Sequence, residues 1–279
     1  MRTQADIIEK LTRFGSGQEP DIDVAGAALL AGALDRPALP LARYHRHQKN
    51  LCNKVGAYAR VDDGPVPVAV MIDALRQVLA RHYGYGGGES EGADEDDFDL
   101  SRVIDSRTGS SEALAILYAT TARRLSWDAQ LIHIPGRMLI RLQGQGERLV
   151  ADPLGDGRTL EPADIRAMLK AFDGNDAELE PDGLRVLDDR EALLRLLAGR
   201  KSVLLRAKRL EDAAFVLDLA LRIAPEEPTL WRECGLLNAR LDRIQAAVDA
   251  LEEYLRLGAG DQARYNTTIL LQELRTRLT

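Results

Sequence analysis

The spacing of apolar residues predicts that the first third of the chain is helical. Between positions 21 and 60, apolar side chains recur every three or four residues, and Pro37 and Pro40 interrupt the pattern. A pair of helices is therefore expected there. A similar run covers 65–83 and ends at glycine. Because the opening of the chain also interleaves charged and apolar side chains as an amphipathic helix does, we expect residues 1–83 to be helical.

The segment 84–99 breaks this pattern. Glycines at its start are followed by a run of acidic side chains, Glu89, Glu91, Asp94, Glu95, Asp96, Asp97 and Asp99. Almost no apolar side chain is present to be buried, so we expect a mobile acidic loop. The glycines lack the Gly-Lys-Ser/Thr ending of a phosphate-binding loop. A docking tail for a basic partner is the alternative.

A helix followed by short strands is expected next. Residues 110–127 have helical spacing, and the Ser and Thr side chains just before them offer N-cap chemistry. Three short β-like runs follow at 129–134, 137–142 and 148–151, with Pro-Gly and Gly-Gln-Gly between them. These runs predict an antiparallel meander packed on the preceding helix. Because alternating βαβ units are absent, the fold class is α+β.

Beyond 181–183 the pattern is helical only. Asp188 and Glu191 resemble a capping box that opens a helix reaching about residue 206. Apolar residues then repeat at an offset of 34, as in Leu217 with Leu251, and 34 residues is the tetratricopeptide period. Two helix pairs and a closing helix would make a short solenoid, whereas an ordinary helical bundle is the alternative.

We therefore expect two domains. The first, 1–185, comprises a helical segment over 1–83, the acidic loop 84–99 and a helix-plus-sheet core over 100–172. The second, 186–279, is an all-α tail of tetratricopeptide-like repeats.

Composition excludes several classes of protein. The chain has 279 residues, 45% of them apolar, and a formal charge of −7. Such a chain buries a real core, and its acidic excess argues against binding to nucleic acid. No apolar stretch approaches the ~18 residues that a membrane span requires. Two distant cysteines, Cys52 and Cys234, and no apolar leader lead us to expect a reduced, cytoplasmic protein without a membrane partner.

Residues 22–160 and the repeat tail resemble the bacterial SirB-type transglutaminase-like proteins. Four segments carry the resemblance: IDVAGAALLAGALDRPALPLARYHRHQKNL, LSRVIDSRTGSSEALAILYATTARRLSW, LIHIPGRMLIRL and VADPLGDGRTL. In related domains the helix begins with a Gly-x-Cys type of sequence, although many SirB-type members have Pro at the Cys position. The next strand carries Pro-Gly-His and the third element carries Asp-Pro. The resemblance thus implies a transglutaminase-like, papain-like core followed by repeats.

Carried over residue by residue, the resemblance puts the Cys position at Ser111, the His position at Arg137 and the Asp position at Asp152. Only the aspartate is retained. A guanidinium has no lone pair with which to accept a proton, so Arg137 cannot activate Ser111, and we expect no catalysis from this degenerate triad. Ser111 then becomes a first-turn helix residue, and Arg137 and Asp152 are expected to form a charge-assisted pair. His133 is predicted to have the same strand parity as Arg137. Four residues of extended chain, however, place it roughly 13 Å from Arg137.

No metal or cofactor site is expected. His45 and His47 point about 200° apart on a helix, and the cysteines look like small buried side chains. Trp231, which matches Leu197 at the 34-residue offset, is also expected in the interior. The run 43–50 is basic; it is either a solvated helix face or a site for an anion or an acidic peptide, and it could meet the acidic loop.

Three functions stay open. The first is a non-catalytic binding or regulatory module that uses its helical repeats and its vacated cleft to hold an unidentified protein or peptide. The second is a hydrolase or acyl transferase that uses Ser111 with an unidentified base. The third is a sensor with an anionic small molecule at Arg137. The sequence leaves the oligomeric state open.

Overall fold

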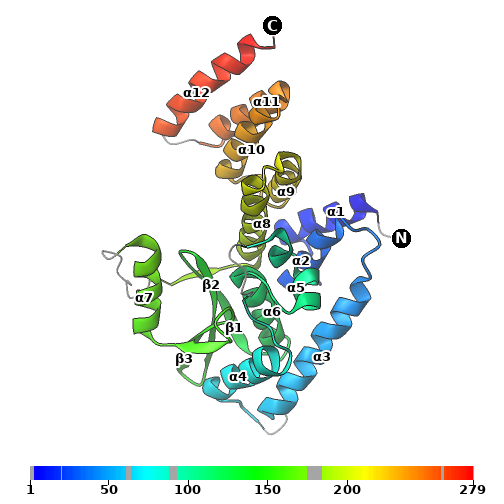
Figure 1. Cartoon of the computed structure of the whole chain (residues 1–279), viewed down its shortest axis with the longest axis vertical. Coiled ribbons are helices and arrows are strands. Elements are labelled where there is room, and N and C mark those ends of the chain that lie inside the picture. Colours follow the sequence, from blue (N-terminus) through cyan, green and yellow to red (C-terminus); the bar gives the residue numbers. More distant parts are fainter. Residues whose placement is uncertain are drawn as a thin grey trace. The chain divides into compact units, whose positions relative to one another are not determined.

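A computed structural model describes residues 3–19, 21–60, 64–87, 93–174, 184–258 and 261–278 (Figure 1). The chain divides into two compact units. The first consists of Met1–Thr3 and Asp21–Leu196, and the second of Gln4–Pro20 and Leu197–Thr279. This division differs from the expected 1–185 and 186–279, because the first helix groups with the repeats.

The first unit opens with the helices that the apolar spacing predicts. The pair expected between 21 and 60 consists of α2 (Val24–Ala33) and α3 (Leu41–Ala59), with both prolines in the connection. Every residue of α2 is buried, and the side chain of Asp23 caps it by accepting a hydrogen bond from the Gly26 N–H at 2.8 Å. The next run forms α4 (Val68–Leu75), which continues directly into the π-helical η2 (Arg76–His82).

The acidic segment is more ordered than the sequence indicates. Residues 88–92 lie outside the described residues, so the expected loop is described only at its two ends. At the second end, η3 (Glu95–Phe98) begins with a capping box formed by Asp94 and Asp97. Asp99 is buried, caps α5 (Leu100–Ser106) and forms an ion pair with Arg36 of the α2–α3 connection. These carboxylates have backbone or guanidinium partners, which the composition of the segment could not reveal.

Helix α6 (Ser111–Arg123) packs on a sheet, as expected, and the described residues form one five-stranded antiparallel sheet of order β4-β3-β2-β1-β5. The three predicted strands are confirmed. The prediction of helix alone beyond 183 is wrong, because a three-residue strand there pairs with β1. Helix α7 packs its apolar side chains against the same sheet. The bounds are β1 (Asp128–Ile134), β2 (Arg137–Gly144), β3 (Glu147–Asp152), β4 (Arg158–Leu160), α7 (Pro162–Asp173) and β5 (Arg185–Leu187).

Helix α8 (Asp189–Arg206) begins at the predicted capping box: Asp188 Oδ1 accepts from the Glu191 N–H at 2.7 Å, and Glu191 Oε2 accepts from the Asp188 N–H at 3.1 Å. The C-terminal portion of α8 belongs to the second unit, together with the remaining helices. These are α1 (Gln4–Gly15), α9 (Leu210–Ile223), α10 (Pro228–Arg240), α11 (Ile244–Arg256) and α12 (Asp261–Thr276).

The second unit has the helix order that the 34-residue offset predicts. Helix α9 packs on α10, α10 on α11 and α11 on α12, with α1 packed against α9. A Cβ at Gly15 would lie 2.2 Å from the Ile223 carbonyl oxygen, so glycine permits the close approach of α1 to α9. In the described portion of the chain, no helix combines the length and apolarity needed to cross a membrane.

Candidate functional site

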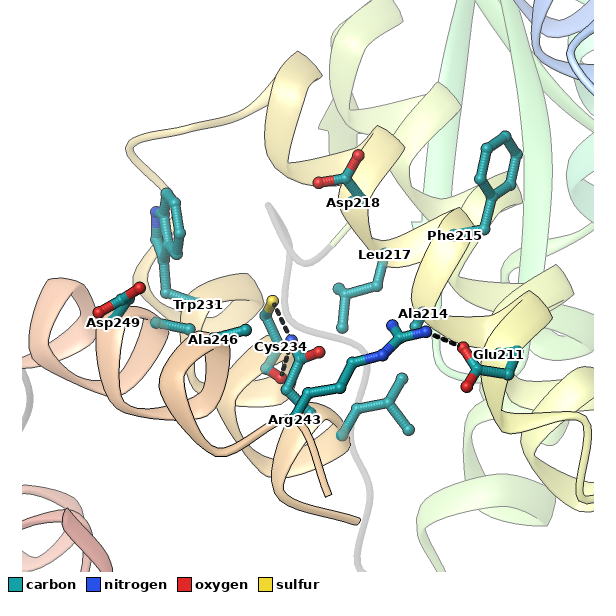
Figure 2. Close-up of a pocket in the computed structure, with 13 residues that line it drawn as sticks. Glu211, Ala214, Phe215, Leu217, Asp218, Trp231, Cys234, Arg243, Ala246 and Asp249 are labelled. Atoms are coloured by element: carbon teal, nitrogen blue, oxygen red, sulfur yellow. Dashed lines mark hydrogen bonds and ion pairs between the residues drawn. The ribbon is translucent and has the colours of Figure 1, made fainter. Parts of the chain in front are cut away.

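The second unit contains a groove between α9, α10 and α11 (Figure 2). Its volume is about 610 Å³, which lies within the range of ligand-binding pockets. Apolar side chains line much of it, and Phe215 is 39% exposed. The sequence did not single out Phe215, because its exposure depends on how the helices pack.

The groove has an acidic rim. Its lining holds the carboxylates of Glu211, Asp218 and Asp249 and the guanidinium of Arg243. Arg243 forms an ion pair with Glu211, and Arg222 forms one with Asp218. Asp249 accepts a hydrogen bond from the Gln245 amide at 2.7 Å. Figure 2 shows the Arg243–Glu211 pair on one side of the groove and Asp249 on the other. A segment with basic and apolar side chains would complement this surface.

Two residues expected in the interior line the groove instead. Trp231 and Cys234 are half-buried, whereas Cys52 is buried as expected. The indole N–H of Trp231 donates to the Pro225 carbonyl oxygen at 2.7 Å. Burial raises the pKa of the Cys234 thiol, and Asp218 raises it further. A protonated thiol is a poor nucleophile, so Cys234 contributes surface to the groove rather than chemistry.

In the first unit, Ser111 stands at the N-terminus of α6. The preceding Ser110 is the N-cap, and its Oγ accepts from the Ala113 N–H at 3.2 Å, which confirms the predicted capping. Ser111 is the first residue of the helix and is 6% exposed. Its Oγ accepts a hydrogen bond from the Met138 N–H at 3.1 Å, so α6 is tied to the beginning of β2.

Arg137 and Asp152 form the expected pair. Arg137 Nη1 lies 2.7 Å from Asp152 Oδ2, and Asp152 Oδ1 also accepts from the Leu154 N–H at 3.1 Å. The side chain of Asp152 is 2% exposed and that of Arg137 is 31% exposed. The Asp152 carboxylate is thus buried, and its charge is balanced by the Arg137 guanidinium, which reaches solvent.

This arrangement provides no base for the Ser111 hydroxyl. Among the described residues, the hydrogen bond to Ser111 Oγ comes from a backbone N–H, which is a donor and cannot remove a proton. Asp152 is engaged by Arg137 and by the backbone, and a guanidinium is not a base at physiological pH. A serine hydroxyl without a base is a weak nucleophile.

A tyrosine near Asp152 does not supply the missing base either. Tyr118 lies on α6, 1% exposed, and its hydroxyl has no hydrogen-bond partner within the described portion of the chain. Burial raises the pKa of Tyr118, and the charges of Asp156 and Asp152 raise it further. Its hydroxyl therefore stays protonated at neutral pH.

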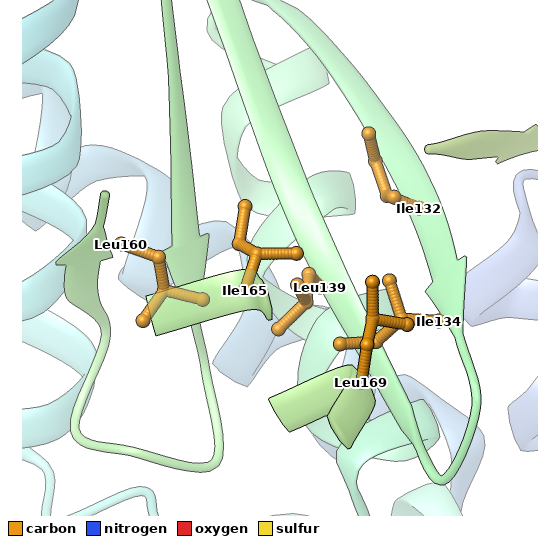
Figure 3. Packing of buried hydrophobic residues seen from close by; sticks show 6 residues of the cluster. All are labelled: Ile132, Ile134, Leu139, Leu160, Ile165 and Leu169. Atoms are coloured by element: carbon orange, nitrogen blue, oxygen red, sulfur yellow. The ribbon is translucent and has the colours of Figure 1, made fainter. Parts of the chain in front are cut away.

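The parity assigned to His133 is wrong. The two-residue turn of Pro135 and Gly136 pairs Ile134 with Arg137 and His133 with Met138. Residues paired across antiparallel strands share a face, so His133 and Arg137 are on opposite faces of the sheet. The face of Arg137 also bears Ile134 and Leu139, which pack against α7 in the apolar cluster of Figure 3.

Burial makes His133 a weaker base than an ordinary histidine. Burial lowers the pKa of His133 to about 4, and the nearby charges of Arg195 and Arg185 lower it further. No hydrogen bond joins His133 to Ser111 in the described residues. Nor is any group of three or more His, Cys, Asp or Glu side chains there placed to hold a metal ion.

Comparison with known proteins agrees with this architecture. A model of the Transglutaminase-like superfamily matches residues 42–198, and a Tetratricopeptide repeat model matches 201–272. A UPF0162 protein of Xylella fastidiosa is 29% identical over 187 residues, which are 66% of this chain and 66% of that protein. SirB1 of Salmonella typhimurium is 28% identical over 187 residues, which are 66% of this chain and 69% of SirB1.

Among solved structures, a crystal structure of menin aligns with a TM-score of 0.38 and 9% identity, covering 91% of this chain and 70% of menin. A likeness of that size is too weak to bear on fold or function.

Proposed function

This chain belongs to the transglutaminase-like superfamily, and from that premise we propose that it is a non-catalytic protein-binding or regulatory module. It acts through its helical repeats, and the Arg137–Asp152 pair keeps a structural role. The Arg137–Asp152 ion pair, together with the Met138 N–H that donates to Ser111 Oγ, is the observation that carries the non-catalytic aspect of this proposal. A family's activity is not inherited when the groups that perform its chemistry are replaced.

The groove of the second unit supports the binding role. Tetratricopeptide repeats generally present concave surfaces to peptides or partner helices. Here the apolar side chain of Phe215 is exposed beside carboxylates such as Asp249. The partner is thus a protein segment with large apolar residues flanked by Lys or Arg, since such a segment would bury the apolar surface and place a cation beside Asp249.

A displayed library of random peptides, selected against the full chain, tests this proposal. We expect enrichment of peptides that combine basic and large apolar residues, and Phe215→Ala should weaken their binding about tenfold. Phe172→Ala is the matched control, because Phe172 lies on α7 of the first unit and is 64% exposed. Acidic peptides, or equal binding by the two variants, would contradict the proposal.

The alternative, a hydrolase or acyl transferase that uses Ser111, requires a base that this site does not offer. A serine-directed covalent probe that labels Ser111 would favour this second function.

A further inference from the structure

A second pocket, in the first unit, is unrelated to the triad positions and to the repeats. It lies between α3 and α5, has a volume of about 300 Å³ and is lined by the charged and polar side chains of Arg43, Arg46, His47, Asn50, Asp105 and Arg107. That volume is at the lower end of the range for small-molecule sites.

The charges of the side chains that line this pocket do not cancel, and we call it the basic pocket. Arg43 Nη2 pairs with Asp105 Oδ1 at 2.6 Å, and Asp105 Oδ2 accepts from the Tyr44 hydroxyl at 2.9 Å. Asp105 is therefore satisfied by Arg43 and Tyr44. Arg46 and Arg107 have no carboxylate partner among the described residues. The chain as a whole carries a formal charge of −7, so this is a local surplus of positive charge on an acidic protein.

Arg107 is held in place by aromatic side chains. Its guanidinium lies 4.8 Å from the ring centre of Tyr85 and 5.5 Å from that of Tyr83. Nη1 donates to the Tyr85 hydroxyl and to His47 Nε2, the latter at 3.0 Å. A guanidinium has five N–H donors, so these contacts orient the group and leave donors for a ligand. Stacking of this kind reduces the entropy lost on binding.

His47 supports this arrangement as a neutral ring. Burial lowers the pKa of His47 to about 4, and the charge of Arg107 contributes to the shift. At neutral pH its Nε2 is thus an acceptor, 2.7 Å from the Tyr85 hydroxyl. His47 fixes Arg107 without adding to the charge of the pocket.

We propose that the basic pocket binds the phosphate group of a small phosphorylated molecule, with Arg107 and Arg46 as its guanidinium partners. Planar guanidinium forks match the geometry of phosphate oxygens. Two arginines without carboxylate partners balance a phosphate dianion, whereas a single carboxylate would leave one positive charge uncompensated. Asn50 supplies a neutral amide donor at the same pocket.

Isothermal titration of the full chain tests the proposal with inorganic phosphate, glycerol 3-phosphate and acetate at constant ionic strength. We expect saturable binding of both phosphates and much weaker binding of acetate. Arg46→Gln should weaken phosphate binding about tenfold, which corresponds to the loss of one charge-assisted hydrogen bond. Arg107→Gln should weaken it at least as much.

Arg166→Gln is the matched control, since Arg166 is an exposed residue of α7 outside the pocket. Arg46 is also exposed, so its replacement tests the pocket even where Arg107→Gln disturbs the packing of Tyr85. The proposal is overturned by equal binding of acetate and phosphate, by the absence of saturable phosphate binding, or by full retention of phosphate binding in Arg46→Gln.

Discussion

Arg137 Nη1 lies 2.7 Å from Oδ2 of the buried Asp152, where the family resemblance places the histidine and aspartate of a triad. The two side chains start on different strands and share one face of the sheet. In a working triad the carboxylate orients an imidazole that shuttles a proton. Here it is paired with a guanidinium, which has no lone pair with which to accept a proton.

Restoring histidine alone should not restore activity. In Arg137→His the base returns, but Ser111 Oγ still accepts from the Met138 N–H and lies buried beneath the start of β2. We expect hydrolysis of a chromogenic ester or amide to stay at the rate measured without protein. Turnover above that rate by this single variant would count against the account.

Replacing Arg137 should lower the free energy of unfolding more than replacing Asp152. Arg137→Met leaves a buried carboxylate without its cation and should lower the free energy of unfolding by about 3 kcal/mol. Asp152→Asn leaves a guanidinium that reaches water and should cost only about 1 kcal/mol. Denaturant unfolding measures both, with Arg166→Met as the exposed control. Equal losses would mean that the carboxylate is not desolvated as described.

The free energy of unfolding should fall with acid through His133 of the first unit. The pKa of His133 is about 4 in the folded chain, lowered mainly by burial and then by Arg195 and Arg185, against an ordinary value of 6.5. Between these pH values the unfolded chain binds the proton more readily, so the free energy of unfolding decreases as pH falls from 6.5 towards 4. Above 6.5 the contribution is complete.

Thermal unfolding at pH 7 and pH 4.5 checks this linkage. The decrease in Tm should be smaller in His133→Gln than in the unsubstituted chain, because the variant lacks the titrating ring. Arg166→Gln, at an exposed position of α7, is the control and should keep the full decrease. An unchanged decrease in His133→Gln would show that this imidazole is not desolvated.

The docking of α1 on α9 should depend on Gly15. A methyl group there would lie 2.2 Å from the Ile223 carbonyl oxygen, and a backbone atom cannot rotate away. Gly15→Ala should therefore destabilise the second unit by about 1–3 kcal/mol and expose α1 to proteolysis. The exposed neighbour substitution Ser16→Ala should do neither. Limited proteolysis with mass spectrometry distinguishes the two variants.

Local patterns were sufficient for much of the fold. The spacing around α6, the turns between β1, β2 and β3, and the capping box before α8 each specify structure within a few residues, and all are present. The 34-residue offset likewise specified the order of the repeat helices. β5 was missed because three residues carry too little pattern, and its pairing with β1 comes from residues distant in sequence.

The sites depended more on tertiary packing. The Arg137–Asp152 pair was predictable because a family pattern put both residues on neighbouring strands. The surroundings of Arg107 were not predictable, because it contacts Tyr85, 22 residues away in the sequence, and His47, 60 residues away. The match to Leu197 at the 34-residue offset predicts an interior position for Trp231. In the structure Trp231 lines the groove instead.

The inertness of Ser111 is tested most directly by a fluorophosphonate probe and intact-mass spectrometry of the folded chain, with a serine hydrolase in the same tube as a labelling control. We expect complete labelling of the control and no adduct on this chain, and likewise no adduct on Ser111→Ala. An adduct that maps to Ser111 and disappears in Ser111→Ala would contradict the account.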